Sequence, residues 1–201
     1  MMTDMTDIKN LLFDLGGVIM DIRREDCVAA FSRLGLKNAN DYFGEYRQRG
    51  VFMKLESGEI GPDEFHAELR RALPSGVSDE QIDEALCCFL TGIPRYRLDM
   101  LEALGKKFNV ALLSNTNKIM WDRTIRTEFE KAGRNREFYF PGGIVTSFEA
   151  RSMKPDAKIF EYAVEKLGIK PEETVFYDDS QANVDAAARM GFHTVHVVIN
   201  S

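Results

Sequence analysis

Acidic and hydroxyl side chains follow three short apolar segments of the chain, at the point where each segment ends. Asp14 ends the segment LLFD, Ser114 and Asn115 end ALLSN, and Asp178 and Asp179 end VFYDD. If these segments are parallel strands, they share one direction, and their carboxyl ends meet at one edge of a sheet. The sequence therefore predicts a polar site that contains three carboxylates and a hydroxyl.

Lys154 adds a positive charge to this set, because it precedes Pro155 just before a predicted helix. Three carboxylates packed together repel one another and would stay partly protonated unless a cation lay between them. Magnesium takes oxygen ligands and shares the oxygens of substrate phosphates. A lysine and a hydroxyl can bind the phosphate, and a carboxylate can attack it as a nucleophile. The set therefore indicates magnesium-dependent phosphate chemistry.

Each of these residues also has an ordinary structural interpretation when it is taken alone. Asp14 resembles a turn or helix cap, Ser114 resembles a turn residue, and Lys154 resembles a solvated surface lysine. The adjacent pair Asp178 and Asp179 is harder to explain in this way, because two neighbouring buried acids need a cation. The functional interpretation depends on all of the positions occurring together.

The elements that position these residues follow an alternating pattern of strands and helices. Near-continuous apolar runs predict buried strands at Ile8–Phe13, Val110–Leu113, Thr174–Tyr177 and Thr194–Ile199, with a weaker strand at Ile144–Phe148. Helical periodicity followed by a glycine predicts helices at Pro155–Leu167 and Ala182–Met190. This alternation predicts an α/β fold with a doubly wound, Rossmann-like parallel sheet.

The segment from residue 22 to residue 94 breaks the alternation, since its patterns are helical only. Pro62 with acids in the first turn begins one helix, and a capping box at Ser78 begins another. An all-helical insert after the first strand is typical of a cap over the site. We therefore expect a sheet core of residues 1–21 and 95–201 and an α-helical cap domain of residues 22–94.

The composition limits the partners of the protein. The chain has 201 residues and a net charge of −6, which argues against nucleic-acid and anionic-membrane surfaces. Its first residues are polar and acidic, unlike a signal peptide, and no apolar run approaches the roughly 20 residues that span a bilayer. Three cysteines without ligand spacing are expected to be reduced thiols. We expect a cytoplasmic protein that binds a small molecule, and the sequence indicates no oligomeric state.

The chain resembles the haloacid dehalogenase superfamily of phosphohydrolases with a type-1 helical cap. The segments FDLGGV, LLSNTN, MKPD and FYDDSQAN resemble its four motifs in order. The resemblance implies a magnesium-dependent phosphomonoesterase that forms an aspartyl phosphate on a small phosphorylated metabolite. The implied catalytic residues are Asp14 and Lys154, the implied phosphate-binding residues are Ser114, Asn115 and Lys154, and the implied metal ligands are Asp14, the Gly16 carbonyl, Asp178 and Asp179.

Gly16 departs from the family pattern, which has an aspartate there as general acid and base. Losing a general acid typically forfeits about 10²–10⁴ in rate, and a phosphomutase would need that group twice. The motifs most resemble those of bacterial α-D-glucose-1-phosphate phosphatases, which share D-L-G at the first motif. An anomeric hydroxyl is a more acidic leaving group than an ordinary alcohol, so a hexose 1-phosphate would need less protonation. This resemblance favours a sugar phosphate, such as a hexose 1-phosphate, as substrate.

Two other functions remain open from the sequence. A metal-independent 2-haloacid dehalogenase would use the same aspartate and also lacks the acid at position 16, but the pair Asp178 and Asp179 argues against it. A non-catalytic ligand-binding member of the superfamily is supported only by the missing acid. In the cap, we expect that four residues either face the substrate or form a solvated helix face: Arg47, Arg49, Phe52 and Glu56.

Overall fold

The structure of the chain is a computed structural model that describes residues 8–44 and 48–198. Its centre is a five-stranded parallel sheet in the order β5-β4-β1-β6-β7. The strands are β1 (Asn10–Phe13), β4 (Asn109–Ser114), β5 (Ile144–Thr146), β6 (Thr174–Asp178) and β7 (His193–His196). Because β1 lies between β4 and β6, the predicted polar strand ends become neighbours.

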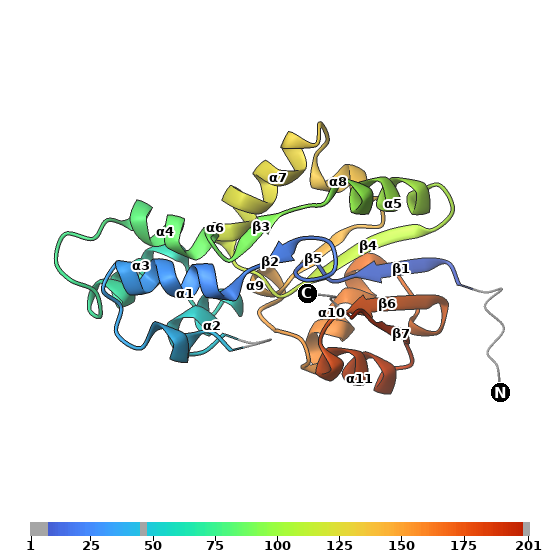
Figure 1. Cartoon of the computed structure of the whole chain (residues 1–201). Coiled ribbons are helices and arrows are strands. Elements are labelled where there is room, and N and C mark those ends of the chain that lie inside the picture. The colour runs from blue at the N-terminus through green and yellow to red at the C-terminus, as the bar shows by residue number, and fades with distance from the viewer. Residues whose placement is uncertain (1–7, 45–47, 199–201) are drawn as a thin grey trace.

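Helices cover both faces of this sheet, as expected for a doubly wound fold (Figure 1). One face carries α5 (Arg95–Gly105), α7 (Arg126–Lys131) and α8 (Arg136–Tyr139), and the other carries α10 (Ala157–Leu167) and α11 (Gln181–Arg189). Side chains alternate along β1, so Leu11 and Phe13 pack on the α5 side while Leu12 packs on the α10 side. The predicted fold class is confirmed.

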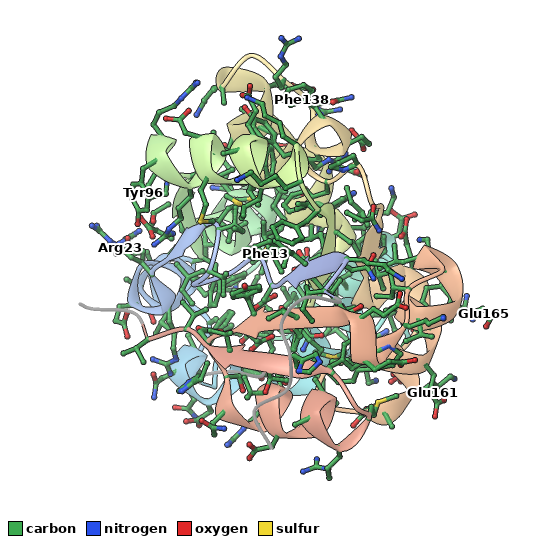
Figure 2. All side chains as sticks on the ribbon, turned by 90° about the vertical axis from the view of Figure 1, so that its right-hand side faces the viewer. Phe13, Arg23, Tyr96, Phe138, Glu161 and Glu165 are labelled. Atoms are coloured by element: carbon green, nitrogen blue, oxygen red, sulfur yellow. The ribbon has the colours of Figure 1, made fainter. Side chains whose placement is uncertain are left out.

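The amphipathic character of α10 shows how its sequence fixes its place. Ile159, Phe160 and Ala163 are buried against the sheet, and the helix ends at Gly168 in the left-handed conformation (φ 63°). Its acidic residues Glu161 and Glu165 are exposed and project from the outer face of the molecule in Figure 2. The apolar face of α10 that the sequence predicts is therefore the face that packs against the sheet.

Four helices form a separate group at the left of Figure 1: α1 (Arg24–Arg33), α2 (Gly50–Glu56), α3 (Pro62–Arg70) and α4 (Asp79–Cys87). Aromatic rings fill their interior, and Phe52 contacts Phe31, Phe43 and Phe65 with ring centroids 4.6–5.3 Å apart. Pro62 begins α3, and Ser78 forms the predicted capping box before α4.

A two-stranded ribbon joins this helical group to the sheet. Strands β2 (Asp21–Ile22) and β3 (Leu90–Gly92) pair antiparallel, so the chain leaves the sheet core and returns to it side by side. The expectation that residues 22–94 contain only helices was wrong for Leu90–Gly92, which form a strand. This strand depends on hydrogen bonds to the backbone of β2, which the local sequence pattern does not reveal. We propose residues 22–94 as the cap domain and residues 1–21 and 95–201 as the sheet core.

Other predicted elements also have different ends in the structure, among them the strands β5 and β7. Strand β5 stops at Thr146, where its partner β4 also ends, and Ser147–Ala150 form the short helix α9 in place of the predicted strand end. The last predicted strand is β7, His193–His196, and Ile199 lies outside the described residues. Before α7, the chain continues from α6 (Lys118–Met120) through a π-helical turn. None of the described helices is long and apolar enough to cross a membrane.

Candidate active site

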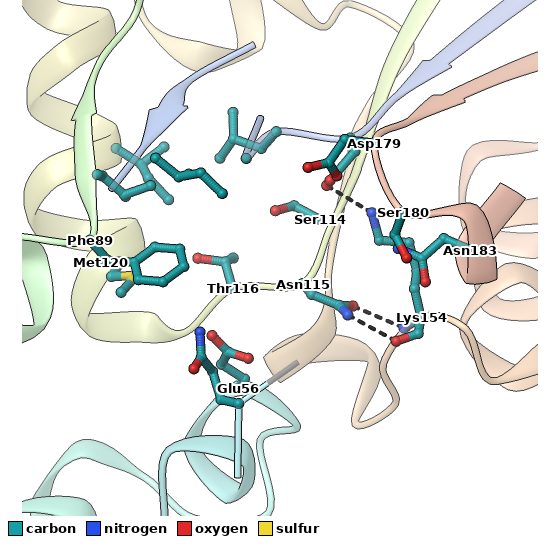
Figure 3. A pocket seen from close by; sticks show the side chains of 17 residues that line it. Glu56, Phe89, Ser114, Asn115, Thr116, Met120, Lys154, Asp179, Ser180 and Asn183 are labelled. Carbon is teal, nitrogen blue, oxygen red and sulfur yellow. Dashed lines mark hydrogen bonds and ion pairs between the residues drawn. The ribbon is translucent and has the colours of Figure 1, made fainter. Parts of the chain in front are cut away.

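A cleft of about 90 Å³ lies at the carboxyl ends of β1, β4 and β6, and Glu56 of the cap faces it from the lower side of Figure 3. The sheet core lines it with Asp14, Ser114, Lys154 and Asp179, and the cap lines it with Glu56. This position is the one that parallel α/β sheets use for ligands, where the loops after neighbouring strands diverge. The predicted strand-end residues therefore do meet at one place.

Lys154 is the centre of the polar cluster. Its Nζ lies 2.7 Å from Asp14 Oδ1 and 2.7 Å from Asp178 Oδ2, and it donates to the Leu113 carbonyl at 3.0 Å. The residue is only 2% exposed. Burial opposes the charge on Lys154, but the two carboxylates outweigh that effect and raise its pKa. A buried ammonium with three oxygen partners is a fixed positive charge, not the solvated lysine of the ordinary interpretation.

Asp178 is held on its other side as well. Its Oδ1 accepts hydrogen bonds from the Ser180 backbone N–H at 2.8 Å and from Asn183 Nδ2 at 2.9 Å. Asn183 lies in the first turn of α11, so the helix start fixes the carboxylate. Both oxygens of Asp178 therefore have partners, and the carboxylate orients Lys154.

Three carboxylates could hold a metal ion. One oxygen from each of Asp14, Asp178 and Asp179 lies within 4.8 Å of the other two. Burial raises the pKa of Asp14 to about 7 against the opposing effect of Lys154, and burial and Asp178 raise the pKa of Asp179 to about 6. Such shifts mark negative charges that lack compensation. The all-oxygen, multiply charged donor set fits a hard divalent cation such as magnesium.

The two polar residues after β4 have different surroundings. Ser114 is buried and lines the cleft. Asn115 also lines it, but its side chain accepts from the Lys154 N–H at 2.9 Å and donates to the Lys154 carbonyl at 3.0 Å, as the dashed lines in Figure 3 show. The amide thus clamps the backbone of the lysine, which explains why an asparagine precedes Thr116 here.

Gly16 lines the cleft beside Asp14 and carries no acid. A Cβ built at this position would meet its nearest neighbour, Ile22 Cγ2, at 3.4 Å, which is ordinary van der Waals contact. Sterics therefore do not require glycine at position 16. Besides Asp14 and Asp179, the carboxylic acid among the described lining residues is Glu56 of the cap.

The four cap residues that were expected to face either the substrate or solvent have different positions in the structure. Glu56 faces the cleft, Phe52 is buried among the cap rings, Arg49 is exposed, and Arg47 lies outside the described residues. Gln48 lines the cleft and was missed, because a lone glutamine carries no sequence signal.

Ser147 was also missed. Its hydroxyl lies 2.6 Å from the Glu56 carbonyl in the cap and 2.9 Å from the Thr116 carbonyl in the sheet core. It also accepts from the Thr116 N–H at 3.0 Å. This contact joins segments that are distant in the sequence, and it depends on how the cap packs on the sheet core. The local sequence pattern does not predict that packing.

Comparison with known proteins places this site in a family. A model of haloacid dehalogenase-like hydrolases matches residues 8–191. The chain belongs to this hydrolase family. The family expected from the sequence is therefore confirmed, and so is the expectation of an enzyme.

Two curated relatives of this family member are named for phosphorylated carbohydrates. D-ribitol-5-phosphate phosphatase of Bacteroides thetaiotaomicron is 34% identical over 93% of this chain and 90% of its own length. A phosphorylated carbohydrates phosphatase of Thermotoga maritima is 29% identical over 95% of this chain and 85% of its own.

A solved structure of a haloacid dehalogenase family enzyme from Bacteroides thetaiotaomicron is also similar, with a TM-score of 0.91 and 39% identity. The match covers 96% of both chains, and that enzyme is a mutant in complex with magnesium and inorganic phosphate.

Proposed function

We propose that this family member is a magnesium-dependent phosphomonoesterase that acts on phosphorylated carbohydrates through an aspartyl phosphate on Asp14. The observation that carries the proposal is the position of Lys154 Nζ, 2.7 Å from both Asp14 and Asp178 inside a cluster of three acids. One buried cation among three carboxylates leaves net negative charge. A divalent cation would offset that charge, and a phosphate would then fit between the cation and the lysine.

The residues of this chain have separate roles in the proposed reaction. Asp14 attacks phosphorus in line and breaks the bond to the ester oxygen, which takes a proton from solvent and leaves as the alcohol. Water then hydrolyses the acyl phosphate, which releases phosphate and regenerates the carboxylate. Lys154 and the Ser114 hydroxyl hold phosphate oxygens, while Asn115 positions the lysine through its backbone. Asp14, Asp178, Asp179 and the Gly16 carbonyl would hold magnesium, which supplies charge stabilisation for the transferred phosphoryl group.

The finer substrate proposal is a hexose 1-phosphate, and Gly16 supports it. Without an acid at position 16, an anomeric leaving group is easier to expel than a primary alcohol. A relative named for D-ribitol 5-phosphate favours a second candidate, in which a primary alcohol leaves. A leaving-group series separates the two: simple alkyl phosphates hydrolysed as fast as sugar 1-phosphates would rule out the anomeric explanation.

A panel of phosphorylated metabolites with magnesium tests the activity itself. We expect hydrolysis of sugar or polyol phosphates, its loss in EDTA, and its loss in Asp14→Asn. The matched control is Asp63→Asn, an exposed aspartate on α3 that should keep full activity. Full activity in Asp14→Asn would refute the nucleophile.

The same panel, extended with a 2-halo acid, tests the two other functions that the sequence left open. Turnover of a 2-halo acid that survives EDTA would support a metal-independent dehalogenase. A null result across the panel with magnesium would favour a non-catalytic ligand-binding protein. The three outcomes exclude one another, so the panel decides between them.

A further inference from the structure

The proposed reaction does not use the part of the cleft away from Asp179, where Figure 3 shows Glu56 and Thr116; we call it the distal end. Glu56 of the cap and Thr116 of the sheet core line this end, and Gln48 of the cap lines the same cleft. We infer that they form a hydroxyl-recognition subsite, which selects phosphate esters of polyhydroxy compounds over esters of the same length without hydroxyls. The inference rests on the proposed function, since it concerns the part of the substrate that leaves with the alcohol.

Gln48 gives the first reason. It lines the cleft and is 6% exposed, yet its Oε1 has no hydrogen-bond partner among residues 8–44 and 48–198. A buried carbonyl oxygen without a donor is uncommon in folded proteins, because it forfeits its hydration. A hydroxyl of a bound ligand is a donor that would satisfy it. The oxygen is therefore available as an acceptor for a ligand O–H group.

Glu56 gives the second reason. Figure 3 shows its carboxyl group directed into the cleft on the side of Thr116, away from Asp179. The residue is 8% exposed and ends α2. A carboxyl group at this end of the cleft can accept hydrogen bonds from the hydroxyls of a ligand.

The packing of α2 against the sheet core fixes the position of Glu56. The Glu56 carbonyl lies 2.6 Å from the Ser147 hydroxyl, which in turn contacts the backbone of Thr116. Two residues further on, Gly58 approaches the backbone so closely that an added Cβ would lie 2.1 Å from the Phe148 carbonyl oxygen. The cap is thus packed tightly at this point, and Glu56 is a preorganised wall of the cleft.

The remaining distal wall is apolar. Phe89, Leu90, Met120 and Ile125 line it, together with Ile22 of the ribbon. A carbohydrate has this same division, with C–H groups on one face and hydroxyls on its edges, and binding sites commonly combine an apolar wall with a few placed polar groups.

A comparison of substrates on the unaltered protein tests the inference directly. With magnesium, kcat/KM for a pentitol 5-phosphate should exceed that for n-pentyl phosphate by about 10- to 100-fold, since one or two hydrogen bonds to buried groups are gained. Both esters release a primary alcohol, so leaving-group chemistry is matched. Equal values for the two esters would overturn the inference.

Two near-isosteric variants locate the effect. Gln48→Met and Glu56→Gln should each lower kcat/KM for the pentitol ester by about 10-fold, mainly through KM, and leave n-pentyl phosphate unchanged. Glu59→Gln, an exposed acid beyond the end of α2, is the matched control and should affect neither ester. Equal losses on both esters would show a structural role and overturn the assignment.

The outcomes also separate this inference from the proposed function. If no phosphate ester is hydrolysed with magnesium, the proposed function fails. If both esters are hydrolysed without discrimination, only the distal subsite fails. The substrate comparison needs no variant, so it decides the question even if a substitution prevents folding.

Discussion

Restoring an acid at position 16 should speed the hydrolysis of esters with poor leaving groups. In Gly16→Asp, the added Cβ meets only Ile22 Cγ2 at 3.4 Å, and Gly16 does not have the positive φ that penalises side chains. The backbone and the Cβ of the new residue are therefore accommodated without a steric clash. A positioned general acid contributes about 10²–10⁴ in rate. We expect the lower end, about 100-fold in kcat for n-pentyl phosphate, because the new carboxyl group lies beside the existing acids.

The assay is kcat for a series of esters whose alcohols differ in acidity. In wild type, log kcat should rise steeply with leaving-group acidity, and Gly16→Asp should flatten that dependence. Gly16→Asn has the same shape without the acid and serves as the control. If the aspartate and asparagine variants have the same rates while both remain folded, leaving-group protonation does not limit the reaction, and our explanation of Gly16 is wrong.

Three further predictions follow from the geometry of the site. In the metal-free protein, the pKa values of about 7 for Asp14 and about 6 for Asp179 lie above the ordinary value of 3.8, so the stability that these groups contribute is fully present below that value and is lost progressively as the pH rises to about 6 to 7. Magnesium replaces those protons, so it should raise Tm more at pH 8 than at pH 5.5, as differential scanning calorimetry can check. Lys154→Met leaves two buried carboxylates unpaired; it should abolish hydrolysis and lower the free energy of unfolding in urea by about 3–5 kcal/mol. Gly58→Ala places a Cβ against Phe148 O at a φ of 67° and should cost about 2–4 kcal/mol by the same urea measurement, with Glu59→Gln unchanged.

The phosphate end of the site could be predicted from the sequence because its geometry is local to a sheet edge. Asp14 and Asp178 each end a strand of recognisable apolar composition, and parallel pairing of β1 with β6 brings them together. Lys154 follows the same logic, since it precedes α10 on the same edge. Direction and spacing along single segments were sufficient for these residues.

The other contacts depend on long-range packing, which single segments do not encode. The role of Asn115 depends on the path of the loop that carries Lys154, 39 residues away. Phe52 and Glu56 lie on the same short helix, yet one packs in the cap and the other faces the cleft. Which face of α2 meets the sheet core is set by its seat on α9, and the helical pattern is compatible with either choice.

The hydroxyl of Ser147 has one hydrogen and lies within reach of two carbonyl oxygens, those of Glu56 and Thr116. It can donate to only one of them at a time. If α2 moves away, the Ser147 hydroxyl can donate to the Thr116 carbonyl instead, and the Glu56 carbonyl becomes hydrated. No buried group of the sheet core then loses its partner. The contact between Glu56 and Ser147 therefore adds little hydrogen-bonding cost to a movement of α2 away from the sheet core.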